Sequence, residues 1–100
     1  MKNPANIGDV LSYSWGYDQT NIEWYKVTKV TPASVQLVRV AGKYEETGFM
    51  SGTTVPDLSA IIGAPITKRV QLFRSPYAVS FDYGIGVVWD GKPEYESHYA

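Results

Sequence analysis

Turn-forming residues interrupt this chain so often that long helices and large sheets are both excluded. Gly, Pro, Asn and Asp clusters recur roughly every 6–12 residues, and the segments between them are rich in β-branched and aromatic side chains. That spacing is typical of a small sandwich or barrel of short strands. Because 100 residues cannot cover two large sheets, the pattern favours one curled sheet.

The strand pattern is clearest in residues 22–31 and 35–40, which the turn at residues 31–34 joins into a hairpin. Within the second segment, Val35 and Leu37 differ in phase from Val38 and Val40, which indicates a bulge or a strong bend. Further strands are expected at residues 9–15, 68–74 and 77–82, with weaker patterns at 43–50 and 85–89.

The sequence therefore predicts a mainly β fold: a small curled antiparallel barrel, SH3-like, of five to six strands with at most one short helical turn. The candidate helical turn begins at Asp57 in the Gly- and Pro-rich region 51–66. Residues 1–100 are expected to form a single domain, with residues 1–7 and 94–100 as extended termini.

Charge and composition exclude several classes of protein. Nine basic and ten acidic residues give a net charge of −1, without a block of like charge. This balance argues against a duplex DNA binder that neutralises phosphates and against an acidic mimic of DNA. The chain has no Cys, no apolar run of membrane-spanning length and no signal-peptide pattern, so we expect a cytoplasmic protein without a disulfide or thiolate metal site.

The most unusual segment is residues 14–21, where two large aromatic side chains flank a glycine and four polar residues follow. A planar ligand could stack on the rings while the polar groups bond its edges. The alternative is a structured turn in which the same side chains bond the backbone. The candidate ligand-binding residues of this segment are Trp15, Tyr17, Asp18, Gln19, Thr20 and Asn21.

Two further residues are candidates for the same site. Trp89, next to the Asp90-Gly91 turn, would extend an aromatic wall if its loop met the first one, although a core position is the simpler interpretation. Arg69 lies in a strand with other cations, and such a face can hold the phosphates of single-stranded nucleic acid. A solvated face is the alternative.

Catalytic and metal-binding motifs are absent from the sequence. It contains no G-x-S-x-G, no P-loop and no paired-His signature, and its one histidine, His98, lies near the end of the chain. Glu45 and Glu46 are adjacent, so a strand would point them to opposite faces. We therefore expect a protein that is not an enzyme and needs no cofactor or metal.

Strings near both ends of the chain resemble a known group of proteins, the small proteins encoded by bacteriophages and other mobile elements. The N-terminal strings are Gly8-Asp9-Val10-Leu11, Ser14-Trp15-Gly16-Tyr17-Asp18-Gln19-Thr20-Asn21 and Trp24-Tyr25-Lys26-Val27. The later strings are Lys68-Arg69-Val70 and Trp89-Asp90-Gly91-Lys92-Pro93 through Tyr99-Ala100, and the resemblance is loose across residues 41–66. That family has no agreed biochemical role. The resemblance implies a role in host take-over or in evading host defences.

Two functions follow as expectations. The first is a non-enzymatic module that binds a nucleotide or single-stranded nucleic acid on its aromatic and polar loop. The second is a protein-interaction module that takes a host protein or peptide in the same groove. Residues 43–50, if they form an exposed edge strand, are a candidate surface for a homodimer.

Overall fold

A computed structural model describes residues 3–16, 20–49 and 51–97 of the chain. These residues form eight antiparallel strands and no helix. The strands are β1 (Val10–Trp15), β2 (Asn21–Val30), β3 (Ser34–Gly48), β4 (Ser51–Ile61), β5 (Ile66–Gln71), β6 (Ala78–Phe81), β7 (Gly84–Val88) and β8 (Glu94–Ser97).

Six of the strands close into a ring. The order β2-β1-β7-β6-β5-β3 returns to its beginning because β3 also pairs with β2, from Trp24 opposite Val40 to Val30 opposite Val35. The expectation of a small curled antiparallel barrel of five to six strands is confirmed. The predicted hairpin forms two neighbouring strands of this barrel, β2 and β3, and its bulge lies in β2 between Val27 and Lys29.

The barrel is filled by side chains that alternate along its strands. Leu11, Val35, Leu37 and Val79 are fully buried, and Tyr13 and Tyr25 are nearly so. The segment before β1 closes one end, where the Asn3 side-chain amide donates hydrogen bonds to main-chain carbonyls of the β2–β3 turn. Burial of this interior is the main stabilising contribution of the barrel.

A second apolar cluster lies on the outer face of β2 and β3. We call it the outer core, and it consists of Trp24, Val40, Thr54 and Trp89. Trp24 is 1% exposed, and its ring meets that of Trp89 edge to face with centroids 5.3 Å apart. Its indole N–H donates a hydrogen bond to the Thr54 hydroxyl at 3.2 Å. Both side-chain phases of β3 are therefore buried, each in a different core.

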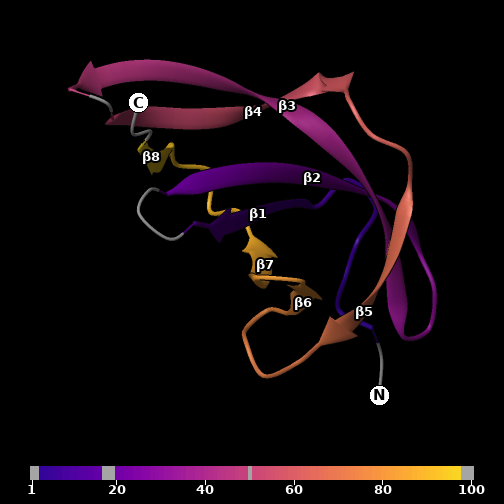
Figure 1. The fold of residues 1–100 in the computed structure, drawn as a ribbon. Coiled ribbons are helices and arrows are strands. Elements are labelled where there is room, and N and C mark those ends of the chain that lie inside the picture. Colours follow the sequence, from indigo (N-terminus) through magenta and orange to yellow (C-terminus); the bar gives the residue numbers. More distant parts are fainter. Residues whose placement is uncertain (1–2, 17–19, 50, 98–100) are drawn as a thin grey trace.

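Beyond Val40, β3 leaves the barrel and forms a long arm with β4, and β8 lies along the other edge of β4 (Figure 1). The arm makes the molecule elongated, with extents of 45 × 28 × 22 Å. Side chains of β8 bond back to the barrel: Glu94 accepts from the Ser12 hydroxyl at 2.9 Å, and Glu96 accepts from the Ile22 amide at 2.9 Å. These bonds hold the arm over the outer core.

Two local expectations differ from the structure. Residues 57–62 form no helical turn: residues 57–61 are the last part of β4, where the register against β3 shifts between Val40 and Ala41, and Ile62 follows the end of the strand. Asp57 does accept a hydrogen bond from the amide two residues on, that of Ser59, but inside this irregular strand. Residues 94–97, expected in the C-terminal tail, form β8 and pair with β4.

Candidate functional site

One end of the barrel opens into a pocket of about 270 Å³. It lies where β1 ends, β2 and β5 begin and β6 turns into β7. Its lining residues are Tyr13, Trp15, Glu23, Tyr25, Ile66, Lys68, Phe81, Asp82 and Tyr83. We call it the aromatic pocket, since five of these nine side chains carry aromatic rings. Its volume is just below the range of about 300–1,000 Å³ typical of small-molecule sites, so it suits one compact ligand.

The rings are arranged by depth. Tyr13 and Tyr25 are buried at the floor, and Phe81 stacks on Tyr13 with centroids 4.4 Å apart and planes 14° from parallel. Phe81 can lie so flat because Gly86 faces Tyr13 across the sheet. A Cβ at Gly86 would come within 2.7 Å of the Phe81 ring.

Two rings stand at the rim. Trp15 is 36% exposed and Tyr83, in the β6–β7 turn, is 82% exposed. Their centroids are 6.4 Å apart with planes tilted by 35°. Trp15 lies two residues beyond Tyr13, so the pleat of β1 sends both side chains to the same face.

Glu23 organises the polar side of the pocket. One of its carboxylate oxygens accepts a hydrogen bond from the Trp15 indole at 2.7 Å, and the other accepts from the Tyr25 hydroxyl at 2.6 Å. Arg39 lies 4.0 Å from the same carboxylate and offsets its charge. Burial, together with the hydrogen bond to Glu23, raises the pKa of the Tyr25 phenol above its ordinary value.

The remaining charged groups lie on the opposite wall. The ammonium of Lys68 is 5.3 Å from the centroid of the Phe81 ring, a cation–π contact. Asp82 lines the pocket beside it. The pocket thus combines flat apolar walls, a cation and two carboxylates at its edges, which suits a planar polar ring better than an aliphatic ligand.

The structure separates the residues that the sequence suggested as one site. Trp15 lines the aromatic pocket, but Trp89 belongs to the outer core, where its indole donates to the Lys92 carbonyl at 2.6 Å. Thr20 is bound through its backbone, which exchanges hydrogen bonds with Ser97, and Asn21 begins β2 opposite Trp15. Tyr17, Asp18 and Gln19 lie outside the described residues.

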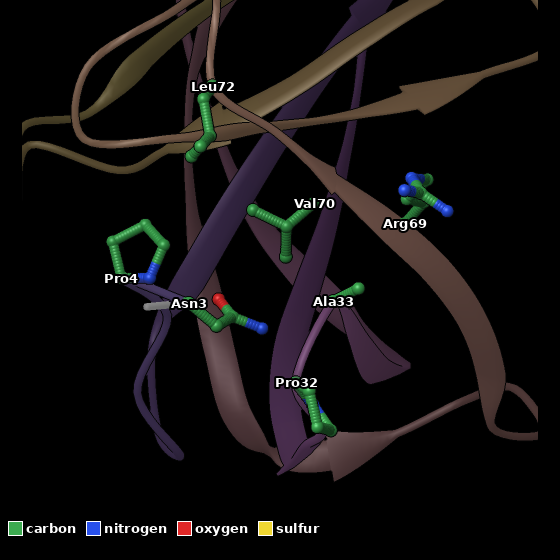
Figure 2. A pocket seen from close by; sticks show the side chains of 7 residues that line it. All are labelled: Asn3, Pro4, Pro32, Ala33, Arg69, Val70 and Leu72. Atoms are coloured by element: carbon green, nitrogen blue, oxygen red, sulfur yellow. The ribbon is translucent and has the colours of Figure 1, made fainter. Parts of the chain in front are cut away.

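Arg69 lies at the other end of the barrel, beside the β2–β3 turn. There it lines a smaller hollow of about 180 Å³, at the edge of a group that includes Asn3 and Pro4 (Figure 2). Its exposed guanidinium is therefore not part of the aromatic pocket. Lys68, its neighbour in β5, occupies that position because successive side chains of a strand face opposite sides.

Sequence reasoning missed most of the pocket lining. The useful signal was the i, i+2 spacing of Tyr13 with Trp15 and of Glu23 with Tyr25, which places each pair on one face of a strand.

Comparison with models of protein families, with curated proteins and with solved structures finds no match. The described residues bring no three metal-ligating side chains together. They also contain no helix that is long and apolar enough to span a membrane.

Proposed function

We propose that this protein is a non-enzymatic binding module that holds a nucleobase, in a nucleotide or a short single strand, in the aromatic pocket. The observation that carries the proposal is the pair of rim rings, Trp15 and Tyr83, whose centroids are 6.4 Å apart above a stacked aromatic floor. A third ring between two parallel rings needs about 7 Å. A small outward movement of the exposed Tyr83 would provide that space.

The polar groups give the bound base its orientation. The Glu23 and Asp82 carboxylates can accept from amino or imino groups at the edge of the ring, and Lys68 can reach a phosphate. With a net charge of −1, the protein suits a ligand with few phosphates rather than a long duplex. The resemblance to bacteriophage proteins implies that such a module would act in the bacterial cytoplasm, against a host process or a host defence.

The test is a titration of intrinsic tryptophan fluorescence with mononucleotides and short single-stranded oligonucleotides. Since stacking contributes about 1–3 kcal/mol per base, Tyr83→Ala should weaken binding by roughly 5- to 150-fold. Tyr95→Ala is the matched control, because Tyr95 is also exposed, at 59%, but lies on β8.

A wild-type protein that binds none of these ligands, or a Tyr83→Ala variant that binds them unchanged, would overturn the proposal. The protein-interaction alternative gives a different result with the same variants. In that case a host protein is retained from nuclease-treated lysate by the wild type and by Tyr95→Ala, but not by Tyr83→Ala.

A further inference from the structure

Two carboxylates line the aromatic pocket, and they differ in how far the protein already uses them. Each carboxylate oxygen of Glu23 accepts a hydrogen bond, one from the Trp15 indole and the other from the Tyr25 hydroxyl. Asp82 is exposed, and within the described part of the chain its carboxylate has neither a hydrogen bond nor an ion pair. Glu23 therefore positions the walls of the pocket, and Asp82 is the acceptor that a bound base would meet.

Asp82 lies between a floor ring and a rim ring. Phe81, the residue before it, belongs to the stacked floor, and Tyr83, the residue after it, stands at the rim. The turn that carries Asp82 is held on both sides. Phe81 pairs with Gly84 across the turn, and the Tyr83 amide donates a hydrogen bond to the Tyr13 hydroxyl at 3.0 Å. The backbone thus places the Asp82 carboxylate beside the rings before a ligand arrives, which lowers the cost of binding.

A carboxylate at the edge of a stacking site distinguishes one base from another. An ionised carboxylate offers two acceptor oxygens and no donor. Guanine carries two neighbouring N–H donors, at ring nitrogen N1 and at the 2-amino group, which match these oxygens in a bidentate contact. Adenine and cytosine present one amino group beside an acceptor ring nitrogen, and uracil presents one N–H between two carbonyl oxygens. Each of these three bases would therefore turn a lone pair toward the carboxylate.

From the position and bonding of Asp82 we infer that the base held in the aromatic pocket is guanine, with its N1–H and 2-amino group donating to the Asp82 carboxylate. The inference rests on the proposed function and adds the identity of the base to it. It also ranks a related base: hypoxanthine has the N1–H but lacks the 2-amino group, so it keeps one of the two hydrogen bonds.

Isothermal titration calorimetry with the 5′-monophosphates of guanosine, inosine, adenosine, cytidine and uridine tests the assignment. The wild-type protein should bind GMP roughly tenfold or more tightly than AMP, CMP or UMP, because each of these loses a hydrogen bond to a charged group and adds a repulsion. IMP should bind roughly five- to tenfold more weakly than GMP, since it loses one hydrogen bond without the repulsion.

Asp82→Asn separates this contact from stacking. The carboxamide has one acceptor oxygen and one amino donor, so it cannot accept both donors of guanine. The variant should lose the advantage of GMP over IMP while its rim ring, Tyr83, still binds either base by stacking. Glu45→Gln is the matched control, because it removes the same charge from the exposed arm and should retain the full preference.

The outcomes distinguish the inference from the proposed function. Equal affinity of the wild-type protein for all these nucleotides overturns the guanine assignment and leaves the binding of a nucleobase standing. A preference for GMP that survives in Asp82→Asn also overturns the assignment, because another group must then recognise the base. If neither these nucleotides nor short oligonucleotides bind, the proposed function is overturned and the assignment with it.

Discussion

The Trp15 indole and the Glu23 carboxylate are joined by a hydrogen bond of 2.7 Å that fixes a rim ring of the aromatic pocket to its polar wall. Glu23 also accepts a hydrogen bond from the Tyr25 hydroxyl at 2.6 Å. One carboxylate therefore positions both Trp15 at the rim and Tyr25 at the floor of the pocket. The side chain is only 17% exposed, and Arg39 beside it lessens the cost of burying the charge.

Replacing Glu23 should therefore affect both stability and binding. In Glu23→Ala, Trp15 and the partly buried Tyr25 hydroxyl lose their acceptor, and we expect a loss of about 2–3 kcal/mol in the free energy of unfolding. Urea denaturation measures this change. Glu45→Ala, on the exposed arm, is the control and should alter stability by less than about 0.5 kcal/mol. An unchanged unfolding midpoint for Glu23→Ala would show that these hydrogen bonds contribute nothing.

The outer core depends on a single hydroxyl. Thr54 is 2% exposed and accepts the Trp24 indole N–H. Thr54→Val keeps the shape but leaves that N–H without an acceptor, so it should cost about 1–3 kcal/mol. Thr54→Ser keeps the hydroxyl and should retain the hydrogen bond. If thermal unfolding finds Thr54→Val as stable as Thr54→Ser, the hydrogen bond is not stabilising.

The arm requires a residue without a side chain at Gly52. A Cβ there would lie 2.1 Å from the main-chain oxygen of Glu45, so the paired strands would have to separate. We expect Gly52→Ala to cost about 1–3 kcal/mol and to increase hydrogen exchange in the arm. Gly48→Ala is the control, since its Cβ would meet only the movable Ser51 hydroxyl, at 3.1 Å. Equal exchange in the two variants would contradict this assignment.

Alkaline pH should destabilise the fold through two buried phenols. Burial raises the pKa of Tyr25 and Tyr77 above the ordinary value of 10.0, and hydrogen bonds to Glu23 and Asp9 raise it further. Both phenols therefore stay protonated in the folded chain at a pH where they ionise in the unfolded chain. Their stabilising contribution is complete below pH 10.0 and is lost as the pH rises above it.

Phenolate absorbance followed together with circular dichroism checks this pH dependence. Tyr25 and Tyr77 should ionise only as the fold is lost, and Tyr77→Phe should remove one of these late phenols. Reversible ionisation of Tyr25 and Tyr77 near pH 10.0 in the native chain, without unfolding, would contradict the expectation.

The barrel could be predicted from the sequence because short β-rich segments and frequent turns are local properties. The mixed phase of Val35, Leu37, Val38 and Val40 indicates a bulge or a bend, and the structure has a bulge in the paired strand β2, between Val27 and Lys29. The larger reason is that β3 is buried on both faces: its outer face lies in the outer core with Thr54 of β4 and with Trp89, which comes from the far end of the chain. Two strands were hard to predict from local sequence. β4 contains Gly52 and Pro56, which are typical of turns, and β8 is only 4 residues long.

The candidate site was predicted less well, for the same reason. Trp15, a predicted site residue, is 36% exposed and lines the aromatic pocket. Its neighbours Tyr83 and Lys68 come from the other half of the chain, and sequence spacing could not bring them to it. The sequence suggested Arg69 for this site, but Lys68 occupies it. Neighbouring residues of a strand face opposite sides, so an error of one residue in register exchanges them.

The ring of strands closes where Leu11 of β1 meets Val88 of β7. Leu11 and Val88 are far apart in the sequence, so this contact forms slowly, because most of the chain between them must be ordered first. The same closure brings Tyr13 against Phe81 and so creates the stacked floor of the pocket. Folding intermediates that hold the β2–β3 hairpin but not this seam should therefore be unable to bind a planar ligand, and recovery of binding should follow the slowest refolding phase.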